Sequence, residues 1–227
     1  MYEPEPVKVV LLGETGVGKT SIISQFITKK FNLRIPTSVS ATFISKTIEF
    51  PEFEKAIKFD IWDTVGQEKY RSLAKIFYKD AKVIIFVYDI TKQVTFDELK
   101  NYWLKETSDN VDGNPIIAVV ANKIDKYEEQ EVNNKDGKEL ADKIKAIFQT
   151  TSALSDSGIN TLFENIGKKV IIPDYDYRNT DPQMQKDYIK KAQENKKEAK
   201  NKEKEEKIRL QKKDTKEIKD SNKKKCC

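Results

Sequence analysis

The chain has 227 residues, of which 35% are charged and 37% are hydrophobic, and its formal net charge at pH 7 is +5. It contains no histidine, which excludes histidine bases, histidine triads and histidine metal sites. The two cysteines are the last two residues, so we expect no disulfide in the fold and a reducing compartment. The first residues do not resemble a signal peptide, and no apolar run approaches about 18 residues, so we expect a cytosolic chain that does not span membranes.

Strand-like and helix-like segments alternate along the first 172 residues. The run Val83–Val87 is apolar without alternation, which is typical of a strand covered on both faces. This order predicts a three-layer α/β fold in which helices flank a six-stranded, mostly parallel sheet. The expected strands are Val7–Leu12, Thr42–Phe50, Ala56–Trp62, Val83–Asp89, Ile116–Ala121 and Ile147–Thr151, with a hairpin turn at Pro51–Lys55; the expected helices are Lys19–Thr28, Phe96–Thr107, Lys135–Ala146 and Ile159–Val170.

The octapeptide GETGVGKT, residues 13–20, follows the first expected strand and opens the first helix. Its three glycines allow a tight turn that aims backbone N–H groups inward, while Lys19 supplies a cation and Thr20 a hydroxyl for Mg²⁺. The segment predicts a site for a nucleoside phosphate. Taken alone, the pattern could also be a glycine-rich turn without a ligand.

The segment DTVGQ, residues 63–67, follows the third expected strand. Asp63 is expected at the carboxyl end of that strand, where ligands of open α/β sheets collect, and its carboxylate can hold Mg²⁺ directly or through water. Gly66 leaves room for its backbone N–H to approach a γ-phosphate, and Gln67 is placed to orient an attacking water. Gln67 alone could equally be a solvated loop residue.

Two further segments favour guanine as the base. In NKID, residues 122–125, the carboxylate of Asp125 can accept from both N1 and N2 of guanine, a donor pair that adenine lacks. Asn122 is expected to brace the loop, and Lys123 to lay its aliphatic stem over the base. In TSALSDSG, which begins at Thr151, the Ala153 N–H could donate to guanine O6. This last segment is weak alone, but the four segments occur in order, each after a strand, and together they indicate GTP binding.

With these segments, the chain resembles the Ras superfamily of small GTPases, and within it the Rab family, over about residues 7–172. The resemblance implies the phosphate-loop NTPase fold. Residues 58–62 and 69–74 favour the endosomal branch of the Rab family. The stretches that resemble the Rab family are KFDIW (58–62), KYRSLA (69–74), FYKDA (77–81) and FVYDIT (86–91), together with the terminal Cys226 and Cys227.

The resemblance implies roles for individual residues. Gln67 and Lys19 are the implied catalytic residues, and Thr20, Ser38 and Asp63 the implied Mg²⁺ ligands. Phe31 is the aromatic implied to pack against guanine. The implied nucleotide-binding residues are Gly13, Thr15, Gly16, Val17, Gly18, Lys19, Thr20, Ser21, Phe31, Ser38, Gly66, Asn122, Lys123, Asp125, Ser152, Ala153 and Leu154.

Several residues depart from the family pattern. Ser38 stands where the first switch carries a threonine, and Thr37, one residue earlier, is an alternative hydroxyl ligand. Val65 replaces an alanine beside a loop that must move with the γ-phosphate, so hydrolysis could be slower. Leu154 replaces a lysine, which should weaken support for the base without changing specificity. Partner recognition is open at VSATF, residues 39–43, where a serine replaces a glycine.

Three aromatic residues admit two interpretations. Phe43, Trp62 and Phe77 match a surface triad that Rab proteins present to effectors. They could also be ordinary core aromatics, and for Trp62, on a strand, this alternative is at least as strong.

From about residue 173 the composition changes to lysine and glutamate, with prolines at 173 and 182. Residues 183–227 hold 17 Lys and Arg against 9 Asp and Glu. We expect residues 1–172 to form the GTPase domain and residues 173–227 a flexible, partly helical tether. By the resemblance, Cys226 and Cys227 carry geranylgeranyl groups, and the lysines at 223–225 add attraction to an anionic membrane. A merely solvated tail would explain the mixed charges but not the paired cysteines.

The sequence thus predicts a switch that hydrolyses GTP slowly with Mg²⁺, since no catalytic arginine is evident, and that regulates vesicle traffic by recruiting effectors in its GTP state. Loss of the γ-phosphate would release residues 32–42 and 65–75. The resemblance also implies an exchange factor, a GTPase-activating protein, a GDP-dissociation inhibitor and an escort protein as partners. We expect the chain at the cytosolic face of an intracellular membrane, cycling with the cytosol. Nucleic-acid binding is not expected, because no aromatics interleave the lysines.

Two other classes of function stay open at this level. The first is a GTP-binding module that does not hydrolyse its ligand, given Val65 and Ser38. The second is a phosphate-loop kinase acting on a small acceptor, although no acceptor site is evident and Asp125 argues against ATP.

Overall fold

The computed structural model describes residues 2–31, 42–63, 77–111, 113–179, 181–184, 186–195 and 197–198. Contacts divide the chain into two units, residues 1–177 and 178–227, and each is considered by itself. The second unit is helical at residues 182–184, 186–195 and 197–198. The predicted boundary at residue 172 stays a prediction, and the first unit extends to Tyr177.

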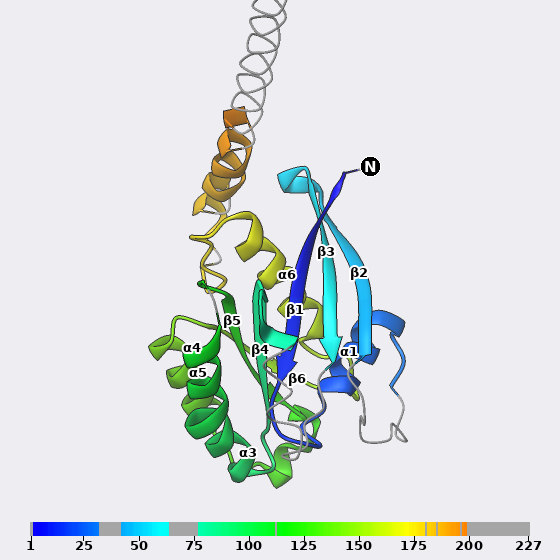
Figure 1. Ribbon diagram of the computed structural model, residues 1–227, viewed down its shortest axis with the longest axis vertical. Coiled ribbons are helices and arrows are strands. Elements are labelled where there is room, and N and C mark those ends of the chain that lie inside the picture. Colours follow the sequence, from blue (N-terminus) through cyan, green and yellow to red (C-terminus); the bar gives the residue numbers. More distant parts are fainter. Residues whose placement is uncertain are drawn as a thin grey trace, which may run out of the picture. The chain divides into compact units, whose positions relative to one another are not determined.

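The first unit contains a six-stranded sheet, which confirms the predicted α/β fold (Figure 1). Its strand order is β2-β3-β1-β4-β5-β6; β2 and β3 pair antiparallel and every other pair is parallel. The hairpin that joins β2 to β3 contains a short 3₁₀ helix, η1 (Pro51–Phe53). The strands are β1 (Pro4–Leu12), β2 (Thr42–Phe50), β3 (Lys55–Asp63), β4 (Val83–Asp89), β5 (Ile116–Asn122) and β6 (Ile147–Thr151).

The helices agree with the predictions except at some of their ends. α1 (Lys19–Thr28) has the predicted bounds, and α6 (Ile159–Ile171) is one residue longer. α5 (Asn134–Lys143) begins at the cap Asn133, whose side chain accepts from the Lys135 N–H at 2.9 Å, and it ends before Ala146 because the chain leaves the helical conformation at Ile144 and Lys145. A 3₁₀ helix, η4 (Ile124–Glu129), follows β5.

The helix predicted at Phe96–Thr107 is longer than expected and contains a π-helical turn. It consists of α3 (Gln93–Glu98), the π-helical turn η3 (Leu99–Trp103) and α4 (Leu104–Asn110). The helix begins earlier than the apolar pattern indicates because the backbone N–H of Gln93 donates to the Glu131 carboxylate at 2.7 Å. A cap supplied from 38 residues away has no local sequence signal.

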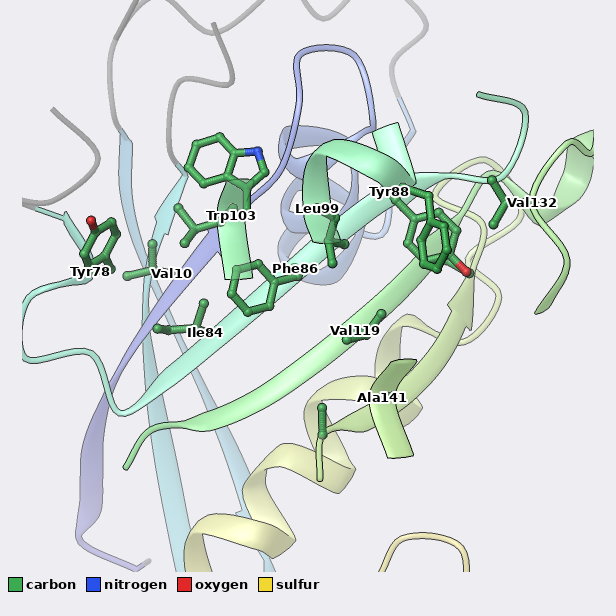
Figure 2. Packing of buried hydrophobic residues seen from close by; sticks show 14 of the residues in the cluster. Val10, Tyr78, Ile84, Phe86, Tyr88, Leu99, Trp103, Val119, Val132 and Ala141 are labelled. Carbon is green, nitrogen blue, oxygen red and sulfur yellow. The ribbon is translucent and has the colours of Figure 1, made fainter. Parts of the chain in front are cut away.

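The helices cover both faces of the sheet (Figure 1). On one face, α1 and α6 pack with β3 through Phe26, Phe59 and Phe163, whose rings make stacked and edge-to-face contacts. On the other face, residues of η3 and α5 join residues of β1, β4 and β5 in a buried cluster (Figure 2). Every residue of β4 is buried, as its continuous apolar run predicts.

The strand register brings three polar residues to one edge of the sheet. Asp89 ends β4 and pairs with Asn122 at the end of β5, which in turn pairs with Thr151 at the end of β6. On the other side, Asp63 ends β3 opposite Leu11 of β1. Four of the predicted or neighbouring site residues thus meet where the strands end, at the carboxyl edge of the sheet.

After α6 the chain turns back along the sheet. The Tyr175 N–H donates to the Ile172 carbonyl at 2.9 Å, and the Tyr175 carbonyl accepts from the Lys169 ammonium at 3.0 Å. The phenolic oxygen of Tyr177 accepts from the Phe148 N–H of β6 at 2.9 Å. This contact satisfies a backbone donor on a strand that ends the sheet, and it fixes the chain beside β6 up to residue 177.

Candidate functional site

The phosphate loop of residues 13–20 joins β1 to α1, as predicted. The Lys19 ammonium is buried and donates to the carbonyls of Gly13 at 2.7 Å and Glu14 at 3.0 Å. Burial lowers the pKa of Lys19 to about 8, against the opposing effects of Asp63 and Glu14. A cation held in this way, at the N-terminus of α1, can receive a phosphate group.

Two glycines of this loop are required by close contacts. Gly13 has φ +144°, and a Cβ there would lie 2.2 Å from the carbonyl oxygen of Val87 in β4. Gly18 has φ +101°, and a Cβ there would lie 2.3 Å from the amide nitrogen of Asn122. Side chains at these positions would therefore push the loop away from β4 and from Asn122, the first residue of the NKID segment.

Thr20 and Asp63 meet at the start of α1. The Thr20 hydroxyl donates to Oδ2 of Asp63 at 2.6 Å, although 43 residues separate the two. A hydroxyl and a carboxylate are hard oxygen donors of the kind that Mg²⁺ binds, so this pair fits the predicted ion. Across the described part of the chain, no group of three or more His, Cys, Asp or Glu residues could hold a metal ion by itself.

Asn122 connects the phosphate loop with the segment after β6. Its amide nitrogen donates to the Val17 carbonyl at 2.8 Å, and its amide oxygen accepts from the Thr151 hydroxyl at 3.0 Å. Asn122 and Thr151 are buried. One side chain thus holds together the loop that faces phosphate and the loops that face the base.

Asp125 is held by a serine of the last segment. The Ser152 hydroxyl donates to Oδ1 of Asp125 at 2.6 Å and accepts from the Ser155 N–H at 3.1 Å. This contact fixes one carboxylate oxygen of Asp125 and brings the neighbouring Ala153 to the same region. Leu154 is about half exposed, so it adds little to the packing of the loop.

The ammonium of Lys123 forms an ion pair with the buried carboxylate of Asp89, with Nζ and Oδ2 2.6 Å apart. The other oxygen of Asp89 accepts from the Thr91 N–H at 2.9 Å and from the Thr91 hydroxyl at 2.8 Å. Lys123 has a positive φ of +69°, so its backbone is also constrained. The aliphatic stem of Lys123 is therefore fixed at both ends, by the backbone and by Asp89.

The sequence matches the Ras family over residues 8–172. It is 43% identical to the Ras-related protein Rab-22A of Homo sapiens over 164 residues, which are 72% of this chain and 83% of that protein. It is 42% identical to the Ras-related protein Rab-31 of Mus musculus over the same shares of the two chains. The Ras-related protein RabJ of Dictyostelium discoideum is 40% identical over 73% of this chain and 63% of its own length. The chain belongs to the Ras family.

Within the Ras family, the chain is a Rab GTPase, a GTP-binding switch of vesicle traffic. The relatives agree with the endosomal branch that residues 58–62 and 69–74 indicate. GTP binding and GTP hydrolysis follow from the family, so the open kinase and non-hydrolysing interpretations are set aside. The roles of individual residues of this Rab GTPase stay predictions.

The three aromatics of the predicted surface triad lie together. The ring centroids of Phe43 and Trp62 are 5.2 Å apart, and those of Trp62 and Phe77 are 5.9 Å apart. Phe43 is 51% exposed, whereas Trp62 and Phe77 are partly buried and pack against the core cluster. Each interpretation therefore applies to part of the triad: Trp62 and Phe77 contact the core, and Phe43 faces solvent.

The remaining predicted residues divide into two groups. Thr15 and Gly16 are exposed in the phosphate loop, Ser21 is half-buried in α1, and Phe31 is half-buried shortly after α1. The other predicted site residues lie outside the described residues: Ser38, Gly66, Gln67, Cys226 and Cys227. Thr37, the alternative hydroxyl ligand, and Val65, which departs from the family pattern, also lie outside them.

Sequence reasoning missed four residues of the site: Glu14, Asp89, Trp103 and Thr151. Asp89 and Thr151 end expected strands, and a search for polar residues at strand ends could have found them. Glu14 lies inside the phosphate loop, but its pattern position carries no required residue type. Trp103 donates to Glu14 from 89 residues away, which no local pattern could indicate.

Proposed function

We propose that this Rab GTPase binds GTP at the carboxyl edge of its sheet and hydrolyses it with Lys19, Thr20, Asp63, Ser38 and Gln67. The observation that carries the proposal is the pair of contacts made by Asn122, which joins the phosphate loop to the loops after β5 and β6. A ligand with phosphates at one end and a base at the other fits two regions held together in this way.

At the phosphate end, Lys19 supports binding and charge stabilisation. Its ammonium is buried, and burial of a charge is costly, so the negative charge of the GTP phosphates would stabilise it. Thr20, Asp63 and Ser38 would hold Mg²⁺, which when bound neutralises charge on the β- and γ-phosphates. Gln67 would orient the attacking water, and a GTPase-activating protein would supply further positive charge.

At the base end, Asp125 would select guanine. The Ser152 hydroxyl donates to one of its oxygens, and this bond restricts the orientation of the carboxylate. A carboxylate accepts from N1 and N2 of guanine, whereas adenine presents an acceptor at N1 and no amino group at C2. The Ala153 N–H would donate to O6, with Lys123 and Phe31 on the faces of the base.

Switching would alter the surface around the aromatic triad. Phe43 is the second residue of β2, which follows residues 32–41, and Trp62 is the second-last residue of β3, which precedes residues 64–76. Loss of the γ-phosphate would change the segments on either side of these aromatics, and effectors would read the change. Exchange factors would act on the same segments.

The same proposal includes a membrane anchor. Among the described residues, no helix is both long and apolar enough to cross a membrane. Cys226 and Cys227 would carry two prenyl groups, which together bind a membrane stably, whereas a single lipid chain binds it only marginally. The lysines at 223–225 would each add about 1 kcal/mol near an anionic leaflet. An escort protein would deliver the chain to an endosomal membrane, and a GDP-dissociation inhibitor would extract it from that membrane.

The first test identifies the nucleotide that the protein carries. Protein purified with Mg²⁺ is denatured, the released nucleotide is separated, and a GTP-loaded sample is followed through one turnover. Bound GDP and slow hydrolysis are expected. Persistent GTP would show that this chain does not hydrolyse its ligand, and absence of any guanine nucleotide would refute the site.

Changing Gln67→Leu is expected to abolish hydrolysis stimulated by an activating protein while leaving GTP affinity within about twofold, because the side chain would act on water rather than on the nucleotide. Gln93→Leu, at the exposed start of α3, is the matched control and should keep wild-type hydrolysis. Full stimulated hydrolysis by the Gln67 variant would remove that residue from the mechanism.

Replacing both terminal cysteines by serine is expected to leave nucleotide binding unchanged and to move the protein from the membrane pellet to the soluble fraction of cells. Sedimentation of tagged protein measures the change, and the wild-type chain treated with a prenylation inhibitor is the control. Continued sedimentation of the double variant with membranes would contradict the lipid assignment.

A further inference from the structure

Trp103 makes a contact with the phosphate loop that the reaction scheme does not use. Its indole N–H donates to a carboxylate oxygen of Glu14 at 3.1 Å. Trp103 is 1% exposed and belongs to the core cluster, where Figure 2 shows its indole nitrogen directed away from Phe86. A buried indole N–H needs an acceptor, and here the acceptor lies inside the phosphate loop.

The local structure places Trp103 for this contact. It ends the π-helical turn η3, which lies between α3 and α4. A π-helical turn adds one residue to a helix and so rotates the residues that follow by about 100° around its axis; such turns are frequent at functional sites. In α4, which follows directly, the Thr107 hydroxyl donates to the Trp103 carbonyl at 2.9 Å.

Glu14 takes part in the phosphate loop through both its backbone and its side chain. Its backbone carbonyl accepts from the Lys19 ammonium at 3.0 Å, so it forms part of the wall around the phosphate-binding cation. Its side chain nevertheless brings a negative charge into a loop that receives a polyanion. Like charges repel, so the direction of this carboxylate affects how firmly the phosphates are held.

We propose that Trp103 is a positioning residue that holds the Glu14 carboxylate against η3, away from the bound phosphates, and thereby slows nucleotide release. The inference rests on nucleotide binding at the phosphate loop. It assigns η3 a role in the lifetime of the bound nucleotide, beyond its part in the core. Loss of the indole N–H removes this contact, so the carboxylate turns toward the phosphates more readily.

The decisive experiment combines two substitutions. In Trp103→Phe, which keeps an aromatic ring but removes the donor, dissociation of a fluorescent GDP analogue is expected to accelerate about tenfold. Adding Glu14→Gln removes the charge, so the double variant should release the analogue within about twofold of the Glu14→Gln single variant. A core defect at Trp103 would not be rescued in this way.

A matched control reduces the packing of the same turn, η3, without removing the bond between Trp103 and Glu14. Leu99→Val removes a methylene from a fully buried residue of η3 whose side chain cannot bond Glu14, and it should lower the melting temperature while leaving the dissociation rate unchanged. Equal acceleration in Leu99→Val and Trp103→Phe would overturn the proposal, as would fast release by the double variant.

A spectroscopic readout follows the contact itself. The chain has two tryptophans, so ¹⁵N-labelled protein loaded with GDP gives two indole N–H resonances, and the one missing from Trp103→Phe belongs to Trp103. Glu14→Gln is expected to shift that resonance and leave the other in place. An unshifted resonance would show that the bond is absent in solution. Failure of the wild-type protein to bind guanine nucleotide would instead refute the proposed function, which separates the two outcomes.

Discussion

Changing Asp125→Asn is expected to lower GTP affinity by roughly 100- to 1000-fold and to raise affinity for xanthosine triphosphate. The carboxylate accepts from N1 and N2 of guanine, and loss of a charged acceptor facing two donors costs about 3–4 kcal/mol. Xanthine carries a carbonyl at C2, and the amide nitrogen of asparagine can donate to it. Competition of GTP, xanthosine triphosphate and ATP against a fluorescent GDP analogue measures the change.

Asp156→Asn is the matched control for this substitution. Asp156 lies in the same segment as Ser152, but its carboxylate forms an ion pair with Lys29 at 3.0 Å that is partly exposed to solvent. An exposed pair contributes little, so its loss should leave base preference unchanged. If Asp125→Asn kept wild-type GTP affinity, the assignment of the base site would be wrong.

Changing Asn122→Ala is expected to weaken both nucleotide binding and the fold. The substitution leaves the Val17 carbonyl and the Thr151 hydroxyl without the partner described here, and each buried group left unsatisfied costs about 1–3 kcal/mol. We expect nucleotide affinity to fall at least about 100-fold, and the melting temperature of nucleotide-loaded protein to fall by roughly 5–10 °C. Titration with the fluorescent analogue and thermal unfolding measure the two effects.

Asn133→Ala separates the loss of stability from the loss of binding. Asn133 caps α5 at an exposed position, so its substitution should cost about 1 kcal/mol of folding free energy and leave affinity unchanged. If Asn122→Ala lost stability but bound GTP as wild type, Asn122 would serve the fold alone, and the observation that carries the proposed site would fail.

The fold was predictable because its signals are local. The apolar run of β4 and the alternation of strands and helices predicted the sheet, and the glycines of the phosphate loop predicted the turn from β1 into α1. The start of α3 was not predictable, because Glu131 caps it from 38 residues away. Local pattern fixes an element's existence better than its ends.

The site was predictable where each residue acts through its own chemistry. Asp125 and Lys19 are recognisable from the segments that contain them. Residues that act through a neighbour are different: Asp89 matters because Lys123 contacts it, and Trp103 because Glu14 does. Such roles arise only when distant segments meet, so one sequence could not reveal them.

The contact of Tyr177 with β6 fixes the end of the first unit at one edge of the sheet. β6 lies at one edge of the sheet and β2, with Phe43, at the opposite edge. Fifty Cα-to-Cα steps separate Tyr177 from Cys227, so under the proposed lipid anchor the membrane could lie at most about 180 Å from Tyr177. The first unit therefore ends at the edge of the sheet opposite the strand that carries Phe43, so a partner bound at Phe43 and the chain at Tyr177 occupy different edges.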